Sequence, residues 1–363
     1  MPAATPGDLR RRTPRWRRRM RLKNKNGNVL MPSMPLNRRR FLGRALGAMG
    51  LLLPVGVGQG HATEPYPSRP VRIIVPYPPG GTTDIVARII AQQLSEQLGR
   101  PFVVDNRAGA SGAIGASAVA KSAPDGYTLL MGTANSHGIN SALQANLPYD
   151  AVKDFAPITV VASTPNVVIV NAKLPVRSLA ELLALAKADP GKLNYGSTSP
   201  GGSPHMSAEL LQAMTGTRMT HVPYKGAAPM LTDLVAGTIQ VGFDNLPSSM
   251  GMIQSGDVRA LAVTTPERWP GTPDLPTVAE SGVPEYEVSG WFGLLAPAGT
   301  PAAIVERIQA AVVQAVRKPG VQEQFAAAGA KPVADRPEVF ARQIAADVER
   351  WKKVVETTGV RLE

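Results

Sequence analysis

The chain has 363 residues, a hydrophobic fraction of 44% and a charged fraction of 18%, which are typical of a globular protein of about two domains. Its net charge of +12 does not indicate a nucleic-acid-binding fold, because residues 1–62 hold 14 Lys and Arg against one acid, while residues 63–363 hold 25 Lys and Arg against 26 acids. The absence of cysteine excludes disulfides, cysteine metal sites and a cysteine nucleophile.

The N-terminal segment has the pattern of an export signal. Arg38-Arg39-Arg40-Phe41-Leu42 resembles the twin-arginine motif, although Gly43 stands where Lys is common and Asn37 where Ser or Thr is common. The apolar stretch over residues 45–57 is too short and too interrupted to span a bilayer, and Gly60-His61-Ala62 offers small residues to a signal peptidase. We therefore predict a Tat-like signal peptide cleaved near Ala62 and a periplasmic mature protein.

Two questions about this segment stay open. The chain could start at Met1, Met31 or Met34. Residues 1–62 could instead be a basic tail that binds nucleic acid, but such tails are rarely followed by an apolar stretch and a small-residue cleavage site. We expect no nucleic-acid partner.

After Tyr66, short apolar runs alternate with segments of helical periodicity, which predicts an α/β fold with largely parallel sheets. The predicted strands are 71–75, 102–104, 127–131, 158–161, 167–170, 193–195, 220–222, 239–243, 260–263 and 293–296. The predicted helices are 84–98, 112–122, 179–187, 204–215, 228–236, 248–255, 301–318, 320–328 and 337–357.

The glycine loop between the first strand and the first helix is a candidate anion site. Residues 76–81 are rich in Pro and Gly, and Thr82 or Thr83 is a candidate N-cap of the helix that follows. Glycines allow a ligand to approach the backbone, and free N–H groups at a helix N-terminus attract an anion. The alternative is an ordinary turn between a strand and a helix.

Two apolar stretches predict where the chain changes domain. Residues 156–170 are prone to form strands, with a break at 163–165, and residues 260–263 form a second such stretch before a long loop. Two crossings predict a discontinuous lobe 1 of residues 63–165 and 263–363 and an inserted lobe 2 of residues 166–262. This arrangement allows hinge closure over a cleft.

Polar loops follow several predicted strands, where open α/β sheets usually bind ligands. These loops are 78–84, 132–137, 196–205 and 223–226, with Asp244-Asn245 as a fifth candidate. The loop Gly196-Ser-Thr-Ser-Pro-Gly-Gly-Ser203 precedes a helix with Ser203 as its predicted N-cap. Two helix N-termini facing each other across a cleft would suit a ligand with a carboxylate.

Several of these residues also have purely structural interpretations. Asp84 in the first turn of a helix is favourable through the helix dipole alone, and it would repel a carboxylate unless it met an ammonium group or acted through water. His205 could be a polar residue at a helix start, and His137 and His221 ordinary hydrogen-bonded histidines. Lys225 could pair with an anion or be solvated.

The sequence contains no recognisable catalytic or metal-binding signature. Gly-x-Ser-x-Gly, the P-loop pattern and His-Glu-x-x-His are all absent, and the three histidines after residue 62 are isolated. We therefore expect no catalysis, no metal and no cofactor. The alternative is an exported α/β enzyme acting on a carboxylated substrate, with His205 or Asp84 as its acid or base.

Six motifs together resemble the substrate-binding proteins of tripartite tricarboxylate transporters, often called Bug proteins. They are the segment from Tyr66 to Asp84, Val104-Asp-Asn-Arg-Ala-Gly109, Ala123-Pro-Asp-Gly-Tyr-Thr-Leu129, Leu193-Asn-Tyr-Gly-Ser197, His221-Val-Pro-Tyr-Lys-Gly226 and Phe243-Asp-Asn245. The resemblance extends from Tyr66 to Glu363. The sequence departs from the family pattern at Ala108, where Pro is frequent, and at residues 198–202, where Gly-x-Gly is frequent, and the second departure could alter which solute fits.

The resemblance implies a two-lobed periplasmic-binding-protein (Venus flytrap) fold, each lobe a mostly parallel sheet flanked by helices, with a ligand in the cleft between lobes. The implied ligand-binding residues of the first lobe are Tyr77, Pro79, Gly80, Gly81, Asp84, Thr133, Asn135 and Ser136. Those of the second lobe are Ser197, Thr198, Gly202, Ser203, His205, Tyr224, Lys225, Gly226 and Asp244.

The function that follows from the resemblance is that of a periplasmic solute receptor. We expect it to capture a small carboxylated compound, such as a dicarboxylate, a tricarboxylate, an amino acid or an aromatic acid. The expected partner is the membrane permease of a tripartite tricarboxylate-type transporter, or a sensor.

Overall fold

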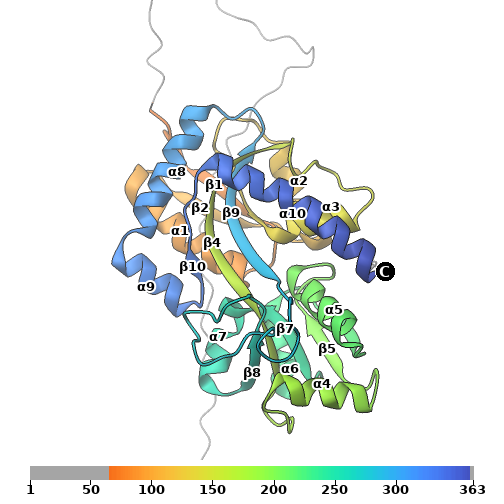
Figure 1. Ribbon diagram of the computed structural model, residues 1–363. Coiled ribbons are helices and arrows are strands. Elements are labelled where there is room, and N and C mark those ends of the chain that lie inside the picture. The colour runs from red at the N-terminus through yellow and green to blue at the C-terminus, as the bar shows by residue number, and fades with distance from the viewer. Residues whose placement is uncertain (1–64, 360–363) are drawn as a thin grey trace, which may run out of the picture. The chain divides into compact units, whose positions relative to one another are not determined.

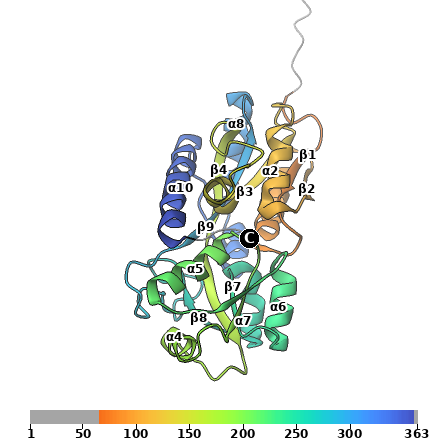
Figure 2. The same ribbon diagram turned by 90° about the vertical axis from the view of Figure 1, so that its right-hand side faces the viewer.

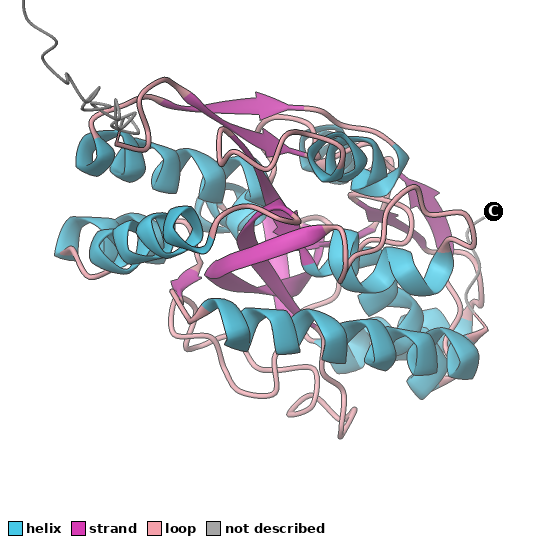
Figure 3. Ribbon diagram, turned by 90° about the horizontal axis from the view of Figure 1, so that it is seen from above, coloured by secondary structure: helices cyan, strands magenta, loops and turns pink. Residues whose placement is uncertain are grey.

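The computed structural model describes residues 65–359 of the chain. The predicted signal peptide, its cleavage near Ala62 and the alternative start residues lie outside this part. In residues 65–359, a ten-stranded mixed sheet is flanked by helices (Figures 1 and 3). No helix within this range is long and apolar enough to cross a bilayer.

The elements alternate along the chain as the sequence predicts. The strands are β1 (Val71–Val75), β2 (Phe102–Asn106), β3 (Thr128–Thr133), β4 (Phe155–Asn171), β5 (Asn194–Ser197), β6 (Thr220–Pro223), β7 (Val241–Asn245), β8 (Val258–Val263), β9 (Ser289–Pro297) and β10 (Lys331–Pro332). The α-helices are α1 (Thr82–Leu98), α2 (Ala113–Ala120), α3 (Asn140–Leu143), α4 (Leu179–Ala188), α5 (Ser203–Thr215), α6 (Ala227–Ala236), α7 (Leu246–Ser255), α8 (Ala302–Val316), α9 (Pro319–Ala327) and α10 (Pro337–Thr358). A 3₁₀ turn (Ala110–Gly112) precedes α2, and a π-helix (Asn135–Ile139) precedes α3.

The sheet has two halves that share strand β4. In the first half, β1 pairs in parallel with β2 and β3, and β9 lies antiparallel between β3 and β4. In the second half, β5 pairs in parallel with β6 and β7, while β7 and β8 flank β4 antiparallel to it. The parallel strands therefore form the outer parts of the sheet, and antiparallel strands join its halves. In Figure 2 the first half lies above the second.

The two strands predicted at residues 158–161 and 167–170 form the single strand β4. The predicted break at residues 163–165 is wrong, because all three residues pair with Ser289–Trp291 of β9. From Asn166 onward the partners of β4 are β7 and β8 instead. One continuous strand thus leads from the first half to the second, as Figure 1 shows.

Both faces of the first half are covered, and the side chains of its strands alternate between them. Ile73 and Val75 belong to one buried cluster with apolar residues of α1 and α8, whereas Ile74 belongs to another with residues of α2 and α10. Successive side chains of a strand point to opposite faces, so a strand buried on both faces is continuously apolar. This explains why Ile73-Ile74-Val75 is recognisable as a strand.

The second half is built in the same way around the end of β4. Val168 and Val170 pack with residues of α4 and α5, and Val167 and Ile169 pack with residues of α6 and α7. Each fully buried Val or Ile contributes about 1.5–3 kcal/mol relative to an exposed one. The β4 strand thus supplies side chains to the cores of both halves.

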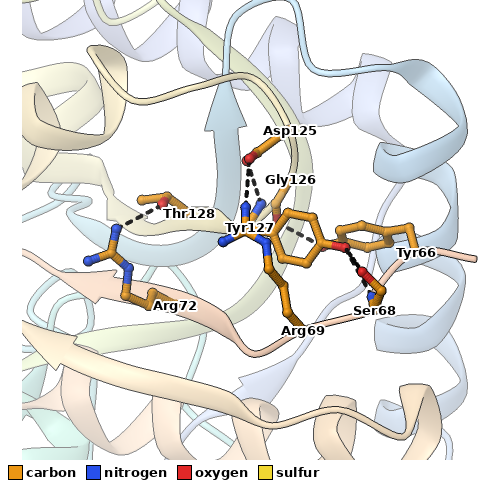
Figure 4. Close-up of polar contacts among 8 residues, drawn as sticks. All are labelled: Tyr66, Ser68, Arg69, Arg72, Asp125, Gly126, Tyr127 and Thr128. Atoms are coloured by element: carbon orange, nitrogen blue, oxygen red, sulfur yellow. Dashed lines mark hydrogen bonds and ion pairs between the residues drawn. The ribbon is translucent and has the colours of Figure 1, made fainter. Parts of the chain in front are cut away.

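The beginning of the described chain is tied to the β3 region by side-chain contacts (Figure 4). The Tyr66 hydroxyl donates to the carbonyl of Gly126 at 2.7 Å. Arg69 pairs with Asp125 at 2.9 Å, and its guanidinium lies 4.0 Å from the centre of the Tyr127 ring. These contacts fix the chain just ahead of β1 and its glycine loop.

Candidate ligand-binding site

A cavity of about 70 Å³ lies where the two halves of the sheet meet, and we call it the cleft cavity. Since one water needs roughly 10–15 Å³ by this measure, there is room for about five waters or a small organic molecule. The first half contributes Tyr77, Pro78, Gly81, Thr82, Thr83, Thr133, Ala134, Asn135, Gly290, Trp291 and Phe292. The second half contributes Thr198, Ser199, Gly202, Ser203, Pro204, Gly226, Ala227, Asp244, Asn245 and Ser248.

Four helices begin at the wall of the cleft cavity. Their N-cap residues are Gly81 for α1, Gly202 for α5, Gly226 for α6 and Asn245 for α7, and all four line the cavity. None of the four N-caps makes a side-chain capping hydrogen bond. Pro204, Pro229 and Pro247 supply no N–H in the first turns of α5, α6 and α7, so each of these helices presents fewer free N–H groups than a helix without proline. Each helix still places about half a positive charge at this end.

The predicted N-caps are wrong by one or two residues. Thr82, Thr83 and Ser203 lie inside their helices, and the caps are Gly81 and Gly202 in extended conformation. The Thr82 hydroxyl donates to Oγ of Ser248, at 3.2 Å, on α7 of the other half. Because glycine occupies the cap, no side chain covers the helix N-terminus on the ligand side.

Ser203 connects the cleft cavity to a buried network. Its Oγ accepts a hydrogen bond from Nδ2 of Asn166 at 2.7 Å, and the same Nδ2 donates to Oγ of Ser207. Asn166 is the β4 residue at which the pairing changes from β9 to β7 and β8. A cavity hydroxyl is thus anchored at the crossing point between the halves.

Asp244 is the one charged residue among those that line the cleft cavity. Its carboxylate accepts hydrogen bonds from Ser248 at 2.7 Å, from Ser249 at 2.6 Å and from the backbone N–H of Asn245 at 2.8 Å. Burial raises the pKa of Asp244 to about 6 although these hydrogen bonds lower it. Asp244 is therefore poised to change protonation near neutral pH.

Asp84 does not line the cleft cavity, and its carboxylate is engaged by the protein itself. It accepts hydrogen bonds from the N–H of Gly80 at 3.0 Å, from Nε of Arg88 at 2.9 Å and from Nδ2 of Asn106 at 3.1 Å. Burial works to raise the pKa of Asp84, but the bonds from Arg88, Gly80 and Asn106 outweigh it and lower that pKa. Its visible role is to hold the glycine loop against β2 and α1.

His205 lies behind the second glycine loop, outside the cavity wall. Its Nδ1 accepts from the N–H of Gly201 at 2.9 Å, and its ring stacks on His221 at 4.1 Å. His221 in turn bonds Oγ of Ser197 at 2.8 Å through Nε2. Burial lowers the pKa of both histidines to about 4, so both support the loop as neutral rings.

Residues 132–137, predicted as a polar loop, are strand and helix. Thr133 ends β3, and Asn135 begins the buried π-helix. His137 is fully buried, and burial lowers its pKa to about 3. Ser136 is turned inward, donating to the carbonyl of Thr133. The helix is stabilised by burial against α10 and α3, which the polar local sequence does not reveal.

The structure brings about half of the predicted site residues to the cleft cavity. Those that line it are Tyr77, Gly81, Thr133, Asn135, Thr198, Gly202, Ser203, Gly226 and Asp244. Those that do not are Pro79, Gly80, Asp84, Ser136, Ser197, His205, Tyr224 and Lys225.

The sequence reasoning missed the wall formed by β9 and by α7. Gly290, Trp291 and Phe292 come from strand β9, which begins four residues earlier than the predicted strand 293–296. Ser248 lies four residues after Asp244, in the first turn of α7, and donates to its carboxylate.

In residues 65–359, no cluster of three or more His, Cys, Asp or Glu side chains could hold a metal ion. The cleft cavity instead offers backbone N–H groups, hydroxyls and amides, a set suited to an organic anion.

A cleft between two α/β halves, lined by helix N-termini and joined by a long shared strand, defines a solute-binding protein with the periplasmic-binding-protein fold. The particular family follows from comparison with known proteins. The family model described as "Tripartite tricarboxylate transporter family receptor" matches residues 86–360, and the chain belongs to this family.

Known relatives agree with this assignment. The chain is 39% identical to protein BugT of Bordetella pertussis, over 88% of this chain and 99% of that protein. Its structure matches that of R. palustris Rpa4515 with adipate, with a TM-score of 0.80 and 44% identity, over 82% of this chain and 99% of that one. It also matches MatC from Rhodopseudomonas palustris with bound malate, with a TM-score of 0.76 and 34% identity, over 80% of this chain and 100% of that one.

Proposed function

We propose that this solute-binding receptor captures a small compound through a carboxylate held in the cleft cavity. The observation that carries the proposal is the convergence of four uncapped helix N-termini on a cavity that no Lys, Arg or His lines. Backbone N–H groups and helix dipoles then supply the positive potential that an anion needs. The relatives with adipate and malate support a carboxylate ligand.

We further propose that the ligand is enclosed by movement of lobe 1 (63–165 and 263–363) against lobe 2 (166–262). The pairing change of β4 after Pro165 supports the first boundary. Where the chain returns from lobe 2 to lobe 1, Tyr286 and Val288 still pack in the core of the second half. The second boundary between the lobes therefore extends from residue 263 to β9. Ligand contacts made by both lobes at once would stabilise the closed form.

The contacts across the cleft support a closed arrangement. Ser111 Oγ donates to the carbonyl of Pro200 at 2.7 Å, and Thr82 donates to Ser248 at 3.2 Å. Each joins the first half to the second, and Thr82 and Ser248 both line the cleft cavity. A bound solute would be shielded from water on the side of Thr82 and Ser248.

We propose export by the Tat-like signal, cleavage near Ala62 and delivery of the solute to a membrane permease or sensor. The periplasmic character of the receptor family supports this. The enzyme alternative loses its supports, since the carboxylate of Asp84 and the ring of His205 are engaged in contacts outside the cavity wall. We therefore propose a receptor without catalysis.

A thermal-shift screen of the mature chain tests the carboxylate proposal. Dicarboxylates, tricarboxylates, amino acids and aromatic acids are compared with neutral sugars and nucleosides at matched concentration. We expect at least one carboxylate to raise the melting temperature and its neutral analogue to have no effect. Stabilisation by neutral compounds alone would contradict the proposal, and turnover of the bound compound, followed by mass spectrometry, would favour the enzyme.

A further inference from the structure

One hydrogen bond joins the two halves of the sheet outside the cleft cavity, and we call it the latch contact. Oγ of Ser111 donates to the carbonyl of Pro200 at 2.7 Å. Ser111 lies between β2 and α2 of the first half, and Pro200 lies between β5 and α5 of the second. Both residues line a second cavity that shares Tyr77 and Thr198, among others, with the cleft cavity. The latch contact therefore bridges the halves close to the candidate site.

The first-half end of the latch contact has a backbone conformation that a residue with a Cβ rarely adopts. The φ angle of Ser111 is +52°, and that of the preceding Ala110 is +45°. Two amides hold this backbone in place, because the Ser111 carbonyl accepts from Nδ2 of Asn135 at 2.9 Å and from Nδ2 of Asn140 at 3.0 Å. A positive φ outside glycine persists only where surrounding contacts enforce it. The position of the Ser111 hydroxyl is thus fixed by the fold.

The second-half end is a turn that is anchored from behind. The N–H of Gly202 donates to the carbonyl of Ser199 at 2.9 Å, and Pro200 and Gly201, whose φ is +68°, occupy the middle of the turn. The N–H of Gly201 donates to Nδ1 of His205 at 2.9 Å. The Pro200 carbonyl and the Gly201 N–H belong to one planar trans peptide group, so they point in opposite directions. By holding the N–H, His205 directs the carbonyl toward the first half.

Asn135 connects the latch contact to the cleft cavity. Asn135 lines this cavity, and the Nδ2 that holds Ser111 also donates to the hydroxyl of Tyr77 at 3.0 Å, another lining residue. The Oδ1 of Asn135 is buried and has no hydrogen-bond partner within residues 65–359. A solute that contacts Asn135 therefore acts on the same side chain that positions the latch contact.

We propose that Ser111 is a latch that shifts the balance between open and closed receptor toward the closed form, with Asn135 and Asn140 as its positioning residues. The Ser111 hydroxyl reaches Pro200 only when the halves are together, so the latch contact stabilises the closed form alone. One hydrogen bond of this kind changes the ratio of closed to open molecules about fivefold. This inference rests on the proposed movement of the two lobes and not on the identity of the solute.

Single-molecule energy transfer between two dyes measures the ratio of closed to open molecules. The chain has no cysteine, so Lys121→Cys in the first half and Lys187→Cys in the second, both at exposed positions, provide the labelling sites. In this labelled protein, Ser111→Ala should lower the ratio about fivefold, both without solute and at each concentration of adipate. Ser111→Gly should lower it equally, although glycine relieves the unfavourable φ and should raise thermal stability.

Ala110→Gly is the matched control for the backbone. Ala110 has a similar φ but no hydroxyl, so its replacement should raise thermal stability and leave the ratio unchanged. Asn140→Ala tests the positioning, because Asn140 holds the Ser111 carbonyl from outside the cleft cavity. It should lower the ratio, and combining it with Ser111→Ala should lower the ratio no further than Ser111→Ala alone.

Two different results would contradict two different claims. Equal ratios in the wild type and both Ser111 variants, or an equal fall in Ala110→Gly, would overturn the latch and leave the carboxylate site intact. Energy transfer that neither adipate nor any variant changed would contradict the lobe movement itself, and with it that part of the proposed function.

Discussion

At the scale of single residues, a side chain that lines the cleft cavity also takes part in the buried hydrogen-bond network of the protein. Ser203 lines the cleft cavity, yet its oxygen is already an acceptor for Asn166, so its hydroxyl proton remains to be donated to a ligand. Ser207 shares the same Asn166 but lies outside the cavity. Substitution of Ser203 should therefore affect ligand affinity, whereas substitution of Ser207 should affect only the stability of the fold.

Ser203→Ala should weaken binding of a carboxylate about fivefold, because one hydrogen bond of about 1 kcal/mol is lost. Calorimetry with the best ligand of the thermal-shift screen measures the effect. Ser207→Ala should cost similar thermal stability and leave affinity near that of the wild type. Unchanged affinity in the Ser203 variant, with the fold intact, would remove Ser203 from the site.

Asp244 is the residue that makes binding depend on pH. Its folded pKa of about 6 lies above the ordinary value, and an anion bound in the same cavity disfavours the ionised form further. Binding therefore takes up a proton, and affinity should rise as the pH falls through the pKa.

We expect a carboxylate to bind about three- to tenfold more tightly at about pH 6 than at about pH 8. In Asp244→Asn the part of the pH dependence that comes from Asp244 should disappear. Any pH dependence that remains in this variant comes from titration of the ligand itself. The opposite result would be an affinity that falls with falling pH in the wild type but not in Asp244→Asn. It would show that ionised Asp244 contacts a cationic group of the ligand.

Single residues also show the limits of sequence reasoning. The sequence left the role of Asp84 open, since an acidic side chain is unfavourable in a site that binds an anion. Its bonds to Gly80 and Arg88 are local, but Asn106 reaches it from β2, a contact that only the fold creates. The motif could identify the residue but not its partners.

At the scale of elements, the site consists of four strand-to-helix junctions, three of which have glycine at the helix N-cap. Gly226 illustrates why glycine is needed at one of them: its φ is +128°, and an added Cβ would lie 3.3 Å from Cγ of Pro78 in the opposite wall. A side chain here would both strain the backbone and hold the two walls apart.

Gly226→Ala should weaken ligand binding about tenfold, because Pro78 must move for the cleft to close. Gly216→Ala is the matched control: its φ is +64°, and an added Cβ would meet no atom within 4 Å. Both variants should lose stability of about 1 kcal/mol in chemical denaturation, and the Gly226 variant alone should lose affinity. Equal affinities of the two variants would contradict the role assigned to Gly226.

Most elements were predictable because their burial patterns are regular. The first strand was predicted with its observed bounds, since its run Ile73-Ile74-Val75 is continuously apolar and buried on both faces. The π-helix at Asn135–Ile139 was missed because Ser, His, Gly and Asn favour loops locally, and tertiary burial overrides that preference.

At the scale of the whole molecule, the fold class and family were predictable from the order of motifs along the chain. The continuity of β4 was not, because Ser163-Thr164-Pro165 is typical of a break, and β9 pairs with it from more than 120 residues away in sequence. About half of the residues that line the cleft cavity could be predicted, because the strand–helix loops carry recognisable motifs. The wall from β9 could not be predicted, because it depends on long-range strand pairing.

The central claim is that helix N-termini hold a ligand carboxylate in the cleft cavity. The most direct measurement is a crystal structure of the protein with the carboxylate that stabilises it most in the thermal-shift screen. The account predicts carboxylate oxygens about 3 Å from first-turn N–H groups of α1, α5, α6 or α7 and from the Ser203 hydroxyl. A carboxylate bound outside this cavity, on a Lys, Arg or His side chain, would contradict it.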